Sequence, residues 1–244
     1  LEKLLKEKGI AAASTDSIPR RQSADKAVLS FSQRRIWFLE QLNPGTSFYN
    51  LPNFVELQGS LDVPLLEQCL NQIVQRHEIL RTTFTTRQDQ PIQQVNNHQL
   101  SLFQIDQREL FDQKSAVQES AVQESANQES ADQKRVVQEK AAVIKAFVQK
   151  ETRHQFDLEK GPLFKATLLR FSESEHILCL NAHHIIFDGW SLDVLLQELA
   201  TLYSASVRGE TASLTDLSLQ NADFAVWQQK WMQGETLKKQ LTYW

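Results

Sequence analysis

The sequence predicts an α/β protein in which a β-sheet packs against helices. Three observations support this fold class. Segments with helical and with strand periodicity follow one another along the 244 residues, as is typical of layered α/β packing. Hydrophobic residues make up 41% of the chain and include 13 Phe and 5 Trp, enough for one sizeable core or two small ones. Only 7 Gly and 6 Pro are present, so long disordered tracts are not expected.

Organised structure is expected to start near Leu29. Either Ser30 or Ser32 can cap a helix whose apolar residues are Ile36, Trp37 and Leu39. Residues 54–57 form a short apolar run that ends near Gly59, and this pattern predicts a strand.

A second helix is predicted to begin at Asp62, a favourable N-cap residue followed by Pro64 in the first turn. Three- and four-residue spacing then predicts one buried helix face, made of Leu66, Cys69, Leu70, Ile73, Val74 and His77. Strands are expected at 82–86 and 92–95, on either side of a polar turn.

Residues 115–139 consist of five copies of a five-residue unit, beginning SAVQE SAVQE. At about 100° per residue each copy turns a helix by roughly 140°, so no continuous apolar stripe forms. Ala, Gln and Glu nevertheless favour helix. We interpret about 112–140 as a low-complexity, solvated insertion of helical propensity, extending from a core helix that resumes near Ala141. A functional repeat is the alternative interpretation.

The second half of the chain continues the alternation. A helix is expected at 142–153, and strands at 164–171 and 176–182, the last leading into His183. Ser191 is expected to cap a helix with an apolar stripe of Leu192, Leu195, Leu196, Leu199 and Tyr203.

Residues 1–27 are interpreted as a linker or the tail of a preceding domain, because 11–27 are small, polar and basic. A docking helix at 1–10 is the alternative. The net charge of −4 and the absence of a basic stripe argue against nucleic acid as a partner. No apolar run is long enough to span a membrane. Cys69 and Cys179 lack metal-ligand spacing, so buried thiols in a reducing, cytoplasmic setting are expected.

The strongest chemical signal is the segment His183-His184-Ile185-Ile186-Phe187-Asp188-Gly189, between a predicted strand and a predicted helix. Sites in α/β proteins tend to lie at such strand ends. Because strand side chains alternate, only one of the two imidazoles can share the face of Leu178, Leu180 and Ala182. Taken alone, the segment is equally consistent with a core histidine and with a catalytic one. A metal site is not favoured, because no third ligand lies at a recognisable spacing.

Other segments resolve this ambiguity, because the chain resembles the condensation domains of nonribosomal peptide synthetases at several places in the family's order. The family's HHxxxDG motif is complete at 183–189, and its RHExLRTxF motif is complete at 76–84. The motif SxAQxRLWxL is present at 30–39 with Ser32 for Ala and Ile36 for Leu. The motif YxDFAxW is present at 221–227 with Asn221 for Tyr, and a segment similar to PFDLxxGPL lies at 155–163 with Gln155 for Pro.

The resemblance implies that residues 28–244 form the amino-terminal lobe of a chloramphenicol acetyltransferase-like fold, with the carboxy-terminal lobe absent from this sequence. It implies amide-bond formation in secondary metabolite biosynthesis, between a carrier-bound acyl or peptidyl thioester and the amine of a carrier-bound amino acid. The implied partners are upstream and downstream peptidyl carrier domains, the second lobe and an adjacent adenylation domain. No cofactor binds directly, since the substrates are carried on phosphopantetheine.

The resemblance places His184 nearest the reacting groups, as a positioning group and candidate general base, with His183, Asp188 and Gly189 completing the catalytic motif. An imidazole with a pKa near 6.5 suits proton transfer at neutral pH. We expect Asp188 to pair with Arg76 or Arg81 and hold the loop, since buried carboxylates need such partners.

Several further motif residues are expected to support the site. Gly189 would permit a close backbone approach or a positive φ. Trp227 is interpreted as core packing, and Gln33, Arg35 and Trp37 as structural.

Two other functions fit the same residues. A non-catalytic fragment that docks carrier proteins is compatible with the repeat and with Asn221. A related acyltransferase acting on an alcohol or a free amine is compatible with HHxxxDG, although the SxAQxRLWxL and RHExLRTxF motifs favour a synthetase. The segment around SxAQxRLWxL also looks most like family members that join an L-configured donor to an L-amino acid.

Overall fold

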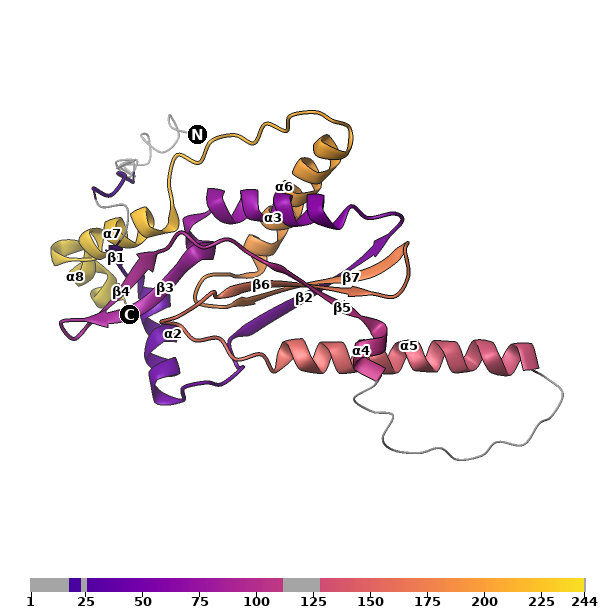
Figure 1. Ribbon diagram of the computed structural model, residues 1–244. Helices are drawn as coiled ribbons and strands as arrows, with labels where there is room; N and C mark the ends of the chain where they lie inside the picture. Colours follow the sequence, from indigo (N-terminus) through magenta and orange to yellow (C-terminus); the bar gives the residue numbers. More distant parts are fainter. Residues whose placement is uncertain (1–17, 23–25, 112–127, 244) are drawn as a thin grey trace.

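A four-stranded sheet lies at the centre of the computed structural model, which describes residues 18–22, 26–111 and 128–243 (Figure 1). Its strand order is β2-β7-β6-β5. The strands are β2 (Asn50–Gln58), β7 (Glu175–His183), β6 (Phe164–Arg170) and β5 (Leu102–Asp106). β7 runs antiparallel to both of its neighbours, whereas β5 is parallel to β6. The mixed sheet and its helices confirm the predicted α/β class.

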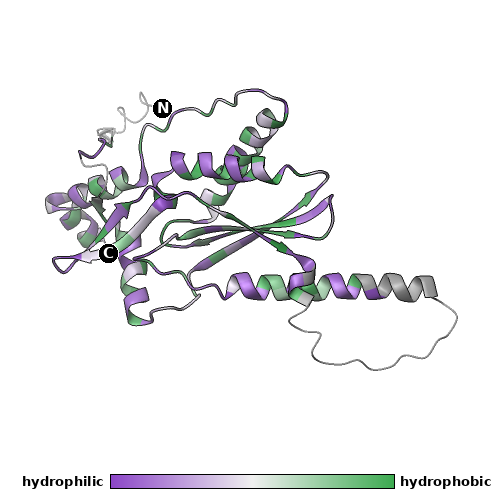
Figure 2. Cartoon of the chain, in the orientation of Figure 1, coloured by the Kyte–Doolittle hydropathy of each residue, from purple (hydrophilic) through white to green (hydrophobic). Residues whose placement is uncertain are grey.

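Helices cover both faces of this sheet. Figure 1 shows α3 (Val63–Arg76) and α6 (Gly189–Val207) above the sheet, and α5 (Gln128–Thr152) with the short α4 (Gln107–Phe111) below it. Alternate residues of β7 enter two separate cores, as the two-residue period of a strand requires. Leu178, Leu180 and Ala182 belong to the larger core with α3 and α6, whereas Ile177 and Cys179 pack with α5. β7 is therefore buried on both faces, and Figure 2 shows its hydrophobic composition.

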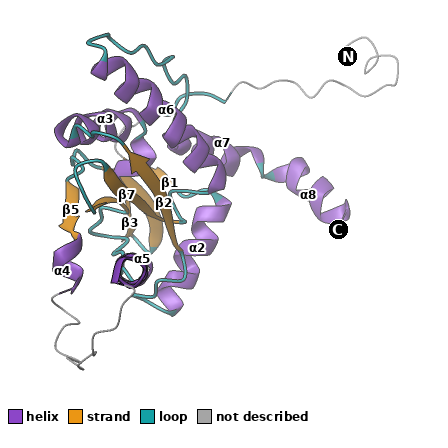
Figure 3. Cartoon of the chain, turned by 90° about the vertical axis from the view of Figure 1, so that its right-hand side faces the viewer, coloured by secondary structure: helices purple, strands orange, loops and turns teal. Residues whose placement is uncertain are grey.

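A smaller antiparallel sheet, of order β1-β4-β3, lies beside the first. Its strands are β1 (Lys26–Val28), β4 (Gln90–Val95) and β3 (Thr82–Arg87). The remaining helices are α2 (Phe31–Leu42), the 3₁₀ turn η1 (Glu78–Arg81), α7 (Asn221–Trp231) and α8 (Gly234–Tyr243). α7 contacts α2, β1 and η1, and Figure 3 shows α2 and α7 along the same side of the molecule.

Most predicted helix starts and strands are confirmed. Ser30, rather than Ser32, caps α2 and accepts a hydrogen bond from Gln33 N at 3.3 Å. Asp62 caps α3 and accepts one from Leu65 N at 2.9 Å. The turn between β3 and β4 places Gln88 and Asp89 at φ of 49° and 59°. The expected helix at 142–153 begins earlier, at Gln128, and so includes the last repeats.

The cap of α6 differs from the prediction. Asp188, not Ser191, is the N-cap, and its carboxylate accepts a hydrogen bond from Ser191 N at 2.8 Å. The backbone of Asp188 is extended, and the helix already begins at Gly189. Ser191 is therefore the third helical residue, where its hydroxyl completes a capping box with Asp188.

Part of the segment expected to be a linker contacts the lobe. Arg20 donates to the carbonyls of Leu217 and Ser218 at 2.9 and 2.8 Å. Arg21 pairs with Asp223 at 2.9 Å and also bonds Glu78. Lys26 and Ala27 form part of β1. The proposed docking helix at 1–10, and the repeat residues up to 127, lie outside the described residues.

Both cysteines are buried and free, as predicted. Burial raises the pKa of each thiol, which disfavours the reactive thiolate. None of the helices that the structure describes combines the length and the apolarity needed to cross a bilayer.

Candidate active site

The HHxxxDG segment forms a strand, a tight turn and a helix start at one end of the central sheet. His183 is the last residue of β7 and pairs with Asn50 of β2. The chain then turns, with Ile186 N donating to His183 O at 3.0 Å. Asp188 caps α6 immediately afterwards. The two histidines are therefore held between the most buried strand of the sheet and a capped helix.

His183 is a buried side chain with 1% of its surface exposed. Its Nδ1 accepts a hydrogen bond from Ile185 N at 3.2 Å, so the proton of the neutral ring is on Nε2, which lies 3.4 Å from Glu40 Oε1. Burial, with a smaller contribution from the charge of His184, lowers the pKa of His183 to about 4. The rings of Tyr49 and Phe156 lie against it, at centroid distances of 5.9 and 6.2 Å. His183 is therefore neutral at pH 7 and holds the turn in place.

His184 is exposed, in contrast to its neighbour. Its backbone N–H donates to Tyr49 O at 2.7 Å. Its Nδ1 lies 2.7 Å from Phe187 O, and because a carbonyl can only accept, Nδ1 must carry the proton of the neutral ring. This bond leaves the lone pair on Nε2, so the ring is oriented as a proton acceptor.

A cleft of about 380 Å³ opens beside His184. It is lined by both polar and apolar groups, which come from α2, η1, the HHxxxDG turn, the first turns of α6 and α7, and the residue before β2. The polar side chains are Ser30, Ser32, Gln33, Arg35, Tyr49, His184, Asp188, Ser191 and Asn221. Residues of the SxAQxRLWxL, RHExLRTxF, HHxxxDG and YxDFAxW motifs therefore meet in one cavity.

Asp188 does not pair with either arginine, which corrects the sequence expectation. Its carboxylate accepts hydrogen bonds from the backbone and hydroxyl of Ser191, at 2.8 and 2.6 Å, and these bonds lower its pKa. Arg76 instead bonds Glu198 at 3.0 Å and the carbonyl of Thr215, and Arg81 donates to Asn96 O at 2.9 Å. Because Asp188 is exposed, no desolvation requires a cationic partner.

Gly189 also differs from the expectation. It is absent from the positive-φ residues of the described chain, and a Cβ added there would meet no atom within 4 Å. Neither backbone conformation nor crowding within this lobe therefore requires glycine at this position.

Gln33 links three of the motifs. Its side-chain N–H donates to Asn221 Oδ1 at 3.2 Å and approaches Ile185 O at 3.5 Å. Asn221, which stands where the resemblance expects Tyr, is thus a hydrogen-bonding partner within the site. Gln33 itself is buried, and its role in joining these segments agrees with its interpretation as a structural residue.

Two other residues differ from their interpretations. Arg35, expected to be structural, is exposed and lines the cleft; neither spacing nor polarity signalled this. Trp227 is half-buried and stacks on Trp231 at a centroid distance of 5.3 Å, outside both core clusters.

Comparison with known proteins decides the family. The condensation domain model matches residues 23–244. This chain belongs to the condensation domain family. Linear gramicidin synthase subunits C and D of Brevibacillus parabrevis are 39% and 40% identical to it, over 99% and 88% of the chain. Malpinin synthetase of Mortierella alpina is 35% identical over 88% of the chain.

Solved condensation domain relatives have the same fold. The starter condensation domain of rhizomide synthetase superposes with a TM-score of 0.68 at 21% identity, and the X-domain from teicoplanin biosynthesis, in complex with OxyB, with 0.70 at 25%. This supports the expected lobe of the chloramphenicol acetyltransferase-like fold. The chain spans 47% and 44% of those two chains, and 3% and 4% of gramicidin synthase subunits C and D.

Within the described part of this condensation domain, no cluster of three His, Cys, Asp or Glu could hold a metal ion.

Proposed function

We propose that this condensation domain chain supplies the histidine-bearing half of a site that forms an amide bond. The substrates are an acyl or peptidyl thioester on one carrier domain and the amine of an amino acid on another. Both arrive on phosphopantetheine arms, and the remaining half of the domain closes the site. The observation that carries the proposal is the orientation of His184, whose Nδ1–H is held by Phe187 O and whose Nε2 can accept a proton beside the cleft.

The reaction requires little covalent chemistry from the protein. The neutral amine attacks the thioester carbonyl, a C–N bond forms, and the C–S bond breaks to release the donor thiol. The nitrogen loses one proton, which His184 Nε2 accepts and can return to the departing thiolate sulfur. General base catalysis of this kind contributes about 10²- to 10⁴-fold, and positioning two tethered substrates can contribute more.

The test is dipeptide formation by the complete synthetase with both carriers loaded. We expect His184→Ala to reduce the single-turnover rate by about 10²-fold or more. The matched control is His98→Ala, since His98 does not line the cleft, and its rate should match the wild type. An unchanged rate for His184→Ala would remove this residue from the catalytic assignment. A wild-type protein that binds loaded carriers without forming product would favour the docking function instead.

A further inference from the structure

A second, smaller cavity adjoins the His184 cleft. It measures about 150 Å³ and lies between α3, η1 and the first turns of α6. Ile79, Ile186, Phe187 and Ser191 line both cavities. These shared residues place the second cavity directly beside the His184 cleft.

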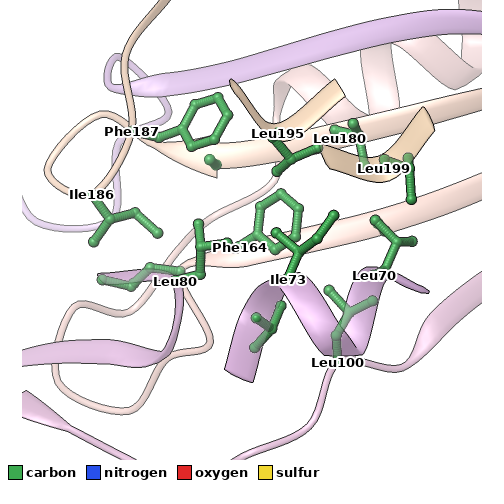
Figure 4. Close-up of a cluster of buried hydrophobic side chains, with 14 of the residues drawn as sticks. Leu70, Ile73, Leu80, Leu100, Phe164, Leu180, Ile186, Phe187, Leu195 and Leu199 are labelled. Atoms are coloured by element: carbon green, nitrogen blue, oxygen red, sulfur yellow. The ribbon is translucent and has the colours of Figure 1, made fainter. Parts of the chain in front are cut away.

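The walls of this second cavity are apolar. Ile73, Leu80 and Leu195 come from the main core, with exposed fractions of 1%, 4% and 3%. Figure 4 shows these side chains in the buried cluster, together with Ile186 and Phe187.

Two polar side chains of the lining, His77 and Ser191, are already engaged. His77 Nε2 lies 2.7 Å from Glu198 Oε2, and Ser191 donates to Asp188 at 2.6 Å. The cavity therefore offers a ligand van der Waals contact and no charge partner.

The rim is formed by Trp190, whose surface is 79% exposed. The apolar ring surface of Trp190 gains free energy when it is buried, so its exposure beside an apolar cavity is suited to covering a bound hydrocarbon. An apolar cavity of about 150 Å³ accepts a benzene-sized molecule.

We propose that this cavity is a side-chain subsite, and that it receives a branched aliphatic or phenyl group of an amino acid undergoing condensation. Trp190 covers the group, and Val194 on α6 limits its size. The inference rests on the proposed function, and it adds a substrate preference determined by the histidine-bearing lobe. The side chain belongs to either the donor or the acceptor aminoacyl group, which share this chemistry.

The test uses the complete synthetase and aminoacyl thioesters of N-acetylcysteamine carrying glycyl, alanyl, leucyl or phenylalanyl groups. One series varies the donor and the other varies the acceptor. Val194→Phe fills the cavity, and we expect it to lower the leucyl-to-alanyl ratio of kcat/KM by roughly tenfold or more in one series, since small hydrophobic pockets discriminate by factors of this order. Gln197→Phe places the same ring on the exposed side of α6, and its ratios should match the wild type.

Trp190→Ala provides a second variant, because truncating an exposed side chain does not threaten folding. It should weaken the preference for the larger groups in the same series as Val194→Phe. The affected series identifies the donor or the acceptor as the source of the side chain. Unchanged ratios in both series, from active protein, would overturn the subsite alone. Absence of dipeptide from the wild-type protein with every pair would instead overturn the proposed function, and the subsite with it.

Discussion

At the residue scale, two adjacent histidines acquire different properties because β7 ends between them. His183 remains in the sheet, where Glu40 and two aromatic rings surround it. His184 lies beyond the last strand residue, and its ring is held by a hydrogen bond from Nδ1 to Phe187 O. Strand parity assigns His184 to the face of Leu178, Leu180 and Ala182, and the cleft beside it is lined by Ile79 and Phe187 of that same core. Alternation therefore separates the two imidazoles, and the end of the strand leaves His184 exposed.

The environment of His183 predicts a pH dependence of stability. Its pKa is about 4 in the folded protein, against an ordinary 6.5. The unfolded chain therefore binds more protons between these values, and His183 lowers the free energy of unfolding as pH falls through 6.5. Between pH 7 and pH 5 we expect wild-type protein to lose about 2 kcal/mol that His183→Gln does not lose. Urea unfolding of both proteins at the two pH values measures this difference.

The comparison with His183→Gln is needed because other groups titrate as well. Burial raises the pKa of Glu40, which acts in the opposite direction as pH falls. Burial also lowers the pKa of His98, His154 and His176, which both proteins retain. Parallel pH profiles for the two proteins would show that His183 titrates in its ordinary range. An NMR titration of the imidazole resonances provides an independent reading of the same pKa.

Asp188 supports His184 indirectly, by capping the helix that follows the Phe187 carbonyl. We expect Asp188→Ala to cost about 1 kcal/mol of stability, the usual effect of losing an N-cap. Asp188→Asn should cost much less, because Asn caps helices about as well as Asp. Thermal unfolding and dipeptide formation by the two variants check this prediction. An equal loss of activity in both variants, with the stability of Asp188→Asn intact, would show that the negative charge itself is required.

At the element scale, the most consequential contacts join segments far apart in the sequence. Arg21 lies before β1, yet it bonds Glu78 of the RHExLRTxF motif and Asp223 of the YxDFAxW motif. Local spacing could predict α3 from Asp62 and the buried face that follows, because those signals lie within one helix. It could not predict the partner of Arg21, which lies some 200 residues away. Because a basic, polar stretch is typical of a linker, this segment was interpreted as one. The pairing expected for Asp188 was wrong for a different reason, because its actual partner, Ser191, is local and is set by the cap geometry.

The Arg21 contacts predict a large loss of stability when the guanidinium is removed. The side chains of Arg21 and Asp223 are 7% and 4% exposed, and breaking a buried ion pair typically costs about 3–5 kcal/mol, because the remaining charge is left uncompensated. We expect a loss of this size in the free energy of unfolding of Arg21→Ala. Arg170→Ala is the matched control, since its pair with Glu173 is exposed and should be worth about 1 kcal/mol or less. Similar losses of stability for both variants would contradict the stabilising role of the buried Arg21–Asp223 ion pair.

At the scale of the whole molecule, the central sheet separates two cores, and the proposed chemistry lies at one end of it. The main core joins α3 and α6 to the sheet, and the smaller one joins α4 and α5. The sequence was sufficient for the α/β class and for most of the main core, because its apolar stripes are regular. β5 and β1 were not predicted, since short edge strands carry little periodicity. The pentapeptide repeat also obscured where the buried part of α5 begins.

The burial of α5 changes along its length. We therefore expect one substitution on this helix to lower the free energy of unfolding strongly and another to leave it almost unchanged. Phe147 is fully buried, and its ring meets Phe54 of β2 at a centroid distance of 5.8 Å. Phe147→Ala should therefore cost about 3–5 kcal/mol, from lost burial and the cavity left behind. Val137 is 66% exposed, so Val137→Ala should change stability by no more than about 0.5 kcal/mol. Urea unfolding of the two variants measures both values.

The same pair of variants tests whether a loss of packing between α5 and the sheet changes the activity of the cleft beside His184. Phe147 packs with Cys179 and Ile177 on the face of β7 that turns away from α3 and α6. His184 is held by the carbonyls of Tyr49 and Phe187, and Phe187 belongs to the main core, whereas Phe147 belongs to the smaller one. Well below the unfolding temperature, Phe147→Ala should therefore form dipeptide at the wild-type rate despite its lower stability. A rate that falls in proportion to the lost stability would mean that the small core and the HHxxxDG turn behave as one unit.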